Sequence, residues 1–290
     1  ATIIDNLTLE GNGESASINR NDRAGMFLRS VNWAPQIRNL SVNSSAMDGI
    51  FLSKASFQGY NWISTNNNGH GMYVDEAHPD VANIHLANNG LNGLRVFDAS
   101  NVELYDVESI NNGGQAVLPT DGIGLFFEKA NDLMSSTKNV SCINCSSTND
   151  AWGGVYVKDS VDIQFHGLSV TDPGNGALAV EVDNANLNFN GWVDIHGLDI
   201  QANRTGPVFQ LVDTEARISG VRLNGAHNGM VWDGREVSLT SSLSDVVLSG
   251  SNCLEFTDLH LVEAVDIDVS ACTGQINFRD STVNMSNSIQ

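Results

Sequence analysis

Residues 48–96 read DGIFLSKASFQGYNWISTNNNGHGMYVDEAHPDVANIHLANNGLNGLRV, and one short phrase occurs in them three times. The phrase is a glycine, an apolar residue, any residue and a second apolar residue, as in Gly49-Ile50-Phe51-Leu52. The glycines Gly49, Gly71 and Gly93 lie 22 residues apart. A fixed period of this length without a helical pattern is typical of a solenoid, in which each repeat forms one turn.

The same phrase continues in both directions along the chain. The spacing returns repeatedly to between 22 and 24 residues, and three rungs carry insertions. In the last two copies another residue replaces the glycine. The eleven turn positions that we assign are Gly25, Gly49, Gly71, Gly93, Gly122, Gly154, Gly176, Gly206, Gly229, Cys253 and Gln275.

Each turn position is followed by a short strand with alternating apolar residues, as a strand with one buried face requires. A second strand signal follows in most repeats, for example Val81-Ala-Asn-Ile84-His-Leu86. Corners rich in Asn and Gly, such as 66–69, tolerate left-handed backbone angles. A leucine-rich repeat would need a leucine-dominated strand and a helical segment. We therefore expect an all-β, right-handed, single-stranded parallel β-helix of about eleven rungs, with two strands and two corners in each.

The unbroken repeat favours one β-helix domain over residues 1–290, either a mature protein or a fragment of a larger chain. Lys+Arg 14 against Asp+Glu 34 gives a net charge of −20, so no nucleic-acid partner is expected. No apolar run is long enough to cross a membrane. Neither terminus shows a capping helix, so we expect flanking domains or a homotrimer to cover the ends.

The four cysteines predict no metal or redox site. Cys142 occupies a position that other repeats fill with Val42 or Leu86, so we interpret it as a small buried apolar residue. The Cys142–Cys145 pair lacks a second Cys or His pair at zinc spacing. Cys253 and Cys272 lie in neighbouring rungs at different phases, so we expect no bridge between them. We expect no cofactor, with calcium as the alternative.

The second and fourth residues after each turn position should point outward. In the first six rungs these columns place aromatic rings beside charged groups. Such rings need a partner that covers them, and flat rings flanked by charges suit a polysaccharide. A long loop inserted after Gly93 or Gly122 could cover the rings instead. The candidate substrate-binding residues are Phe51, Tyr73, Phe97, Tyr156 and Lys158.

The residue before the turn position adds a third column with acids and a histidine. Acids, a histidine and an arginine within a few rungs can supply acid–base chemistry and charge stabilisation. Each of them can also be a solvated or turn-capping residue. The candidate catalytic residues are Asp48, His70, Asp75, Arg95 and Asp121.

The whole chain resembles the right-handed parallel β-helix, pectin-lyase-like superfamily. Asp48-Gly-Ile-Phe-Leu, Gly69-His70-Gly71 and Asn92-Gly-Leu-Arg95-Val are similar to three successive rungs of polygalacturonase-type hydrolases. Met47, Ala24 and Phe97 stand where that family carries two aspartates and a lysine. Of its other branches, the mannuronan epimerases carry Asp-Pro-His, which this chain has reversed as His78-Pro79-Asp80. Phage tailspike depolymerases share no fixed motif.

The resemblance implies an extracellular or virion-surface protein that degrades a polysaccharide, as a glycoside hydrolase or as a lyase or epimerase. Two other functions remain open at this point. One is non-catalytic glycan binding or adhesion, and the other is a structural module of a virion tailspike.

Overall fold

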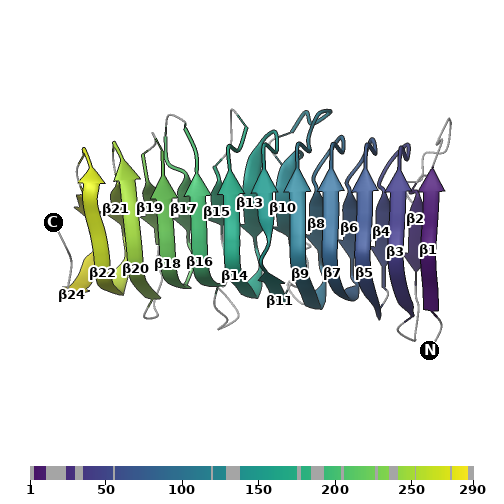
Figure 1. The fold of residues 1–290 in the computed structure, drawn as a ribbon. Coiled ribbons are helices and arrows are strands. Elements are labelled where there is room, and N and C mark those ends of the chain that lie inside the picture. The colour runs from purple at the N-terminus through teal and green to yellow at the C-terminus, as the bar shows by residue number, and fades with distance from the viewer. Residues whose placement is uncertain are drawn as a thin grey trace.

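The structure is a computed structural model that describes residues 3–10, 24–29, 35–54, 56–118, 120–128, 138–174, 178–183, 193–203, 206–225, 228–234, 241–251, 253–274 and 276–286. In these residues the chain forms β-strands and turns and contains no helix. The strands stack side by side along a rod, with β1 at one end and β24 at the other (Figure 1).

Two parallel sheets make up the rod, and the chain alternates between them. Every strand pairing in both sheets is parallel, as the pairing of β4 with β6 and of β5 with β7 illustrates. Sheet A has 13 strands and consists mostly of the longer ones. Its strands are β1 (Ile3–Glu10), β3 (Gln36–Asn43), β5 (Ser56–Thr65), β7 (His78–Ala87), β9 (Ser100–Ile110), β11 (Lys138–Ile143), β12 (Ser146–Thr148), β14 (Val161–Thr171), β16 (Val193–Gln201), β18 (Ala216–Asn224), β20 (Ser241–Gly250), β22 (His260–Cys272) and β24 (Thr282–Ser286).

Sheet B has 11 short strands, one from each repeat. Its strands are β2 (Met26–Arg29), β4 (Ile50–Ser53), β6 (Met72–Asp75), β8 (Leu94–Phe97), β10 (Ile123–Glu128), β13 (Gly153–Lys158), β15 (Val180–Asp183), β17 (Phe209–Val212), β19 (Met230–Asp233), β21 (Leu254–Thr257) and β23 (Ile276–Arg279). The all-β parallel solenoid that the repeat predicts is therefore confirmed.

The core lies between the two sheets, where the first and third residues of each short strand point inward. Leu94 and Val96 of β8 are buried, as are Val102 and Leu104 of the following strand β9. The rings of Phe127 on β10 and Phe165 on β14 meet edge to face with centroids 5.5 Å apart. One hydrophobic cluster accordingly extends along the rod, which explains why valine, isoleucine, leucine and phenylalanine share the repeat positions.

The long strands of sheet A change direction at one residue with a left-handed backbone. In β5 this residue is Asn61, with φ of 58°, and the buried positions shift from Phe57 before it to Trp62 and Ser64 after it. The structure thus adds a bend to the expected two strands and two corners. The bend residues of β3 to β20 are Asn39, Asn61, Asn83, Asp106, Asn144, Gly167, Gly197, Gly220 and Asp245.

A second corner, between sheet A and sheet B, holds a buried ladder of carboxamides. Asn67 Nδ2 donates to Asn89 Oδ1 at 2.8 Å, and Asn89 Nδ2 donates to Asn112 Oδ1 at 2.8 Å. The ladder ends at Asp150, whose Oδ1 accepts from Asn112 Nδ2 at 2.9 Å. Because buried polar groups need partners, this ladder favours asparagine at the corner.

Three repeats have a different phase from the one that the turn residues predict. Leu125 pairs with Leu94, so Gly124 rather than Gly122 is equivalent to Gly93. Gly176 lies outside the described residues, and the pairing of Val155 with Val180 makes Ala179 the turn position. The pairing of Val180 with Phe209 makes Val208, rather than Gly206, the turn position of the next repeat. In each case an insertion placed a glycine a few residues before the true turn position.

The cysteines form two disulfides, Cys142–Cys145 and Cys253–Cys272, and none is free among the described residues. The expectation that Cys253 and Cys272 remain apart is wrong. Cys272 pairs in register with Gly250, so the end of β22 lies one turn beyond the corner that contains Cys253. Cys142 is buried as expected, and its sulfur bonds Cys145 across the bend at Asn144.

Candidate functional site

The outward residues of six neighbouring short strands form the candidate site, which we call the outer strip. Strand pairing aligns them in two columns along the rod. The first column is Phe51, Tyr73, Arg95, Phe126, Tyr156 and Glu181 on β4, β6, β8, β10, β13 and β15. The second column is Ser53, Asp75, Phe97, Glu128, Lys158 and Asp183 on the same strands.

Rings in the first column stack on one another from rung to rung. Phe51 and Tyr73 are parallel within 7° with centroids 5.0 Å apart, and Phe126 and Tyr156 are parallel within 4° at 5.1 Å. Parallel strands about 4.8 Å apart impose this stacking, because equivalent side chains repeat at the strand spacing. The alignment follows from the repeat itself.

Two rings of the outer strip are covered and three are partly open. Phe51 is 4% exposed and Phe126 is 0% exposed, although both point away from the core. Tyr73, Phe97 and Tyr156 are half-buried. The expected aromatic surface is therefore limited to the three half-buried rings.

Arg95 lies between the two ring stacks. Its guanidinium carbon is 5.6 Å from the centroid of the Tyr73 ring and 5.4 Å from that of Phe126, within the range of cation–π attraction. Arg95 Nη2 forms a salt bridge with Glu128 Oε2 at 2.6 Å, and both side chains are largely buried. Charge-assisted hydrogen bonds of this kind hold a guanidinium in one geometry.

Glu128 is a site residue that the sequence reasoning missed. With the turn position at Gly122, the second and fourth residues after it are Gly124 and Phe126. Glu128 therefore fell outside the two outward columns. The true register pairs Glu128 with Phe97 and puts its carboxylate in the second column. Ile123, Leu125 and Phe127 alternate in phase with both glycines, so the alternation alone does not distinguish Gly122 from Gly124.

Asp75 lies in the second column on β6, the strand next to the one that carries Arg95. Burial raises the pKa of Asp75, and the nearby Glu76 carboxylate raises it further. A hydrogen bond from Ser53 Oγ to Asp75 Oδ2 at 3.4 Å acts in the opposite direction. Asp75 and Glu128 are separated by one strand, so their backbones are about 9.6 Å apart.

The far end of the strip is acidic. Burial, followed by the Asp183 charge, raises the pKa of Glu181, and burial with Asp159 raises that of Asp183. Tyr156 donates to Asp183 Oδ2 at 3.4 Å, and burial with the nearby acids raises its pKa. The sequence reasoning also missed Glu181 and Asp183. The turn position predicted at Gly176 assigned Leu178 and Val180 to the outer face instead.

Asp48 and His70 lie in the corner beneath the strip and are fully buried. Asp48 Oδ1 accepts from the backbone N–H of His70 at 2.8 Å, and His70 Nδ1 accepts from that of Asn92 at 3.1 Å. Asn92 Oδ1 continues the series by accepting from the N–H of Ile123 at 2.8 Å. These side chains cap the next rung and support the strip from below, since the His70 ring is 5.5 Å from that of Tyr73.

Asp121 does not continue this corner column. The corrected register places Ile123, one residue before Gly124, in the position equivalent to Asn92. Asp121 lies in the preceding loop, partly exposed, where its N–H bonds the carbonyl of Leu118 at 2.9 Å. The structure therefore brings Asp75, Arg95 and Glu128 together in the strip and leaves Asp121 in the loop that leads to it.

The described residues lack two further features. No group of three or more His, Cys, Asp or Glu side chains among them is arranged to hold a metal ion. Within the same part of the chain, no helix is long and apolar enough to cross a membrane.

The family model for the right-handed beta helix region matches residues 24–194, more than half of the chain. The chain therefore belongs to the right-handed β-helix family. The matched residues include strands β4 to β15, and therefore the whole outer strip.

Two solved structures of epimerase modules share this fold. The A-module of mannuronan C-5 epimerase AlgE6 from Azotobacter vinelandii is similar with a TM-score of 0.61 and 15% identity, over 97% of this chain and 73% of that one. The AlgE4 A-module from the same organism has a TM-score of 0.58 and 15% identity, over 99% and 73%. The tailspike protein gp49 from Pseudomonas phage LKA1 has a TM-score of 0.44 and 10% identity, over 90% and 49%. No curated protein matches the sequence significantly.

Proposed function

We propose that this protein cleaves an extracellular polysaccharide bound along the outer strip. The observation that carries the proposal is the arrangement of Asp75, Arg95 and Glu128 on three successive strands, two of which also carry the half-buried rings of Tyr73 and Phe97. Sugar rings offer apolar C–H faces to aromatic side chains and hydroxyl edges to charged ones. Rungs about 4.8 Å apart would present one set of side chains to each successive sugar.

The two carboxyls suit hydrolysis with inversion. Their backbones are about 9.6 Å apart, which lets the side chains hold their carboxyl groups at the roughly 6.5–9.5 Å that inverting glycosidases use. Asp75, whose pKa burial raises, is the proposed acid that protonates the leaving glycosidic oxygen. Glu128 is the proposed base, which takes a proton from the water that attacks the anomeric carbon. Arg95 orients Glu128 through their salt bridge.

An extracellular location has support from the cysteines. All four form disulfides, which persist mainly in oxidising compartments. The similarity to modules of mannuronan C-5 epimerases agrees with a polysaccharide as ligand.

Site-directed variants test the assignment. Asp75→Asn and Glu128→Gln should each reduce reducing-end release from a panel of polysaccharides by roughly 10²–10⁴-fold. Glu255→Gln is the matched control, because Glu255 occupies the first outward column at the other end of sheet B and should leave the rate unchanged. Wild-type rates in both site variants would refute the catalytic assignment.

Non-catalytic glycan binding is the second candidate function. It is favoured by Asp48 and His70, which cap the corner backbone and so do not extend the acid–base group at the surface. A wild-type protein that binds polysaccharide but releases neither reducing ends nor unsaturated uronates would select this function.

A further inference from the structure

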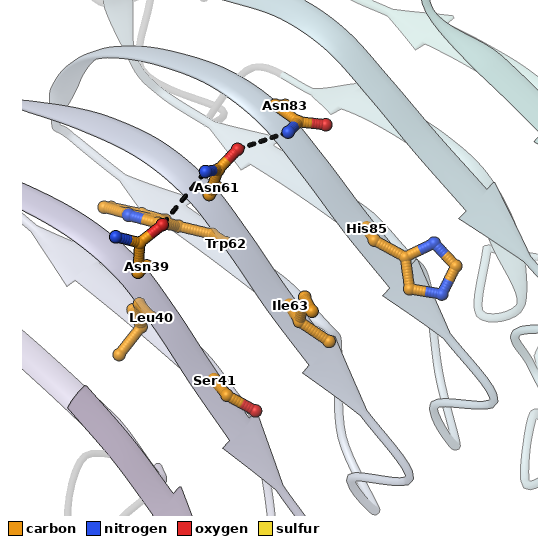
Figure 2. A pocket seen from close by; sticks show the side chains of 8 residues that line it. All are labelled: Asn39, Leu40, Ser41, Asn61, Trp62, Ile63, Asn83 and His85. Atoms are coloured by element: carbon orange, nitrogen blue, oxygen red, sulfur yellow. Dashed lines mark hydrogen bonds between the residues drawn. The ribbon is translucent and has the colours of Figure 1, made fainter. Parts of the chain in front are cut away.

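A groove of about 410 Å³ crosses β3, β5 and β7 on the outside of sheet A, away from the outer strip on sheet B. Figure 2 shows its two rims, which run across the strands with the strand backbone between them. The residues that line it are Asn39, Leu40, Ser41, Asn61, Trp62, Ile63, Asn83 and His85.

One rim is a ladder of amides at the bend of each strand. Asn61 Nδ2 donates to Asn39 Oδ1 at 2.9 Å, Asn83 Nδ2 donates to Asn61 Oδ1, and Asn39 Nδ2 donates to Asp5 Oδ1 at 2.8 Å. Each carboxamide has two N–H donors and an oxygen with two lone pairs. The ladder uses one donor and one lone pair of Asn39 and Asn61, so each keeps the capacity for a further bond of either kind.

The other rim combines apolar and polar contacts. Ile63 is 46% exposed and stands between Ser41 and His85 in register. His85 Nδ1 lies 2.7 Å from Glu108 Oε2 on the next strand. Tyr60, 52% exposed, lies just before the bend and lines an adjacent hollow of about 150 Å³ with Gln36 and Gln58.

We propose that this groove binds a second stretch of polysaccharide, as a non-catalytic site that rests on the proposed function of the outer strip. The groove lining contains no Asp, Glu, Lys or Arg, in a chain whose net charge is −20. Amides in a row beside an exposed aliphatic side chain match a ligand that is rich in hydroxyl groups and has apolar ring faces. The amides repeat at the strand spacing of about 4.8 Å, so successive sugars meet equivalent groups.

The pairing of the strands argues against a peptide occupant. Binding of an extended peptide by strand addition requires an unpaired strand edge. Strand β5 pairs with β3 on one side and β7 on the other, so the backbone under the groove is already paired. A flexible, hydroxylated chain needs no such edge.

A second site on another face changes how the protein handles long chains. One polysaccharide molecule can contact both faces of a protein molecule, or it can link the groove of one protein molecule to the strip of another. In either case the overall affinity for the chain rises although neither site binds more tightly. The groove should therefore matter for long polysaccharides and leave the turnover of short oligosaccharides unchanged.

The test is a double variant, Asn61→Gly with Ile63→Ser. Both changes copy residues that the chain already uses in these columns, namely glycine at Gly167 and serine at Ser41. The matched control is Val247→Ser, which lies in the same column as Ile63 near the other end of sheet A. Thermal unfolding midpoints show whether the variants fold as the wild type does.

Binding is measured by retardation in native gels that contain polymannuronate, polygalacturonate or a neutral β-glucan. For a polysaccharide that retards the wild type, we expect the double variant to bind about tenfold more weakly, from the lost apolar and amide contacts. The Val247→Ser control should bind as the wild type. Equal retardation of the double variant and the wild type overturns the proposal, as does a wild type that no polysaccharide retards.

The same gels separate this proposal from that of the outer strip. In one outcome, the groove variant loses retardation while the wild type turns over no substrate. That pair of results would support the groove as a binding site and would refute the catalytic function of the outer strip. Altered turnover of short oligosaccharides by the groove variant would contradict a separate, non-catalytic site.

Discussion

Replacement of Asp150 by asparagine should remove a pH dependence that the buried ladder builds into the stability of the fold. Asp150 Oδ1 accepts from Asn112, and its Oδ2 accepts from Ser147 Oγ at 2.5 Å and from Ser109 Oγ at 3.0 Å. Burial raises the pKa of Asp150 to about 6, from 3.8, although these hydrogen bonds lower it. The folded protein thus binds the proton more tightly than the unfolded chain does.

The sign of the effect follows from linkage. A raised carboxyl pKa gives stability that is fully present below the unfolded pKa of 3.8 and is lost as the pH rises towards about 6. With about 1.4 kcal/mol for each pKa unit, the loss is at most about 3 kcal/mol. In Asp150→Asn the amide continues the series of Asn67 and Asn112, each of which donates from Nδ2 to a serine three residues earlier, at 3.0 and 2.9 Å.

The assay compares guanidinium unfolding midpoints of the wild type and Asp150→Asn from pH 4 to pH 7.5. We expect the variant to be more stable than the wild type by about 1–3 kcal/mol at pH 7.5, with the difference closing towards pH 4. Taking the difference between two proteins cancels the contributions of other titrating groups. A difference that does not change with pH, or a variant that is less stable at pH 7.5, would refute the reasoning.

Three other predictions concern stability and binding. Leu94→Asp should destabilise the fold by several kcal/mol, because it buries an unpaired charge, and an unchanged melting temperature would show that Leu94 does not face the core. Cys253→Ser should cost about 3 kcal/mol through loss of the disulfide, whose sequence separation is 19, and a reductant should then lower the melting temperature of the variant less than that of the wild type, which has both disulfides to lose; equal lowering in the two proteins would contradict it. Tyr73→Ala should weaken polysaccharide binding by about 1 kcal/mol in calorimetry through lost stacking area, and unchanged affinity would place the ligand elsewhere.

The sequence predicts the fold well because one rung repeats the next. At Gly49, Gly71 and Gly93 the spacing is regular, and the inward and outward faces are as expected. A shift of one residue exchanges the two faces of a strand, so the phase fails where insertions lie near a glycine. The turn position predicted at Gly176 placed Val180 on the outer face, whereas Val180 is fully buried in the structure.

The candidate site is only partly visible in the sequence. Asp75 and Arg95 could be placed because their rungs are regular, whereas Glu128 follows an insertion. The burial of Asp48 could not be foreseen, because it depends on how the corners of successive rungs stack. In the sequence alone, nothing distinguishes the buried Asp48 from the partly exposed Asp75. The salt bridge between Arg95 and Glu128 joins residues 33 apart and follows from the strand pairing alone.

The most direct test of the central claim is a crystal structure of Asp75→Asn bound to an oligosaccharide of the polysaccharide that the wild type cleaves or binds. The account predicts a sugar chain that runs along the rod across β6, β8, β10 and β13, with a ring against Tyr73 and a glycosidic bond between Asn at position 75 and Glu128. An oligosaccharide that occupies any other face while the strip stays empty would contradict it.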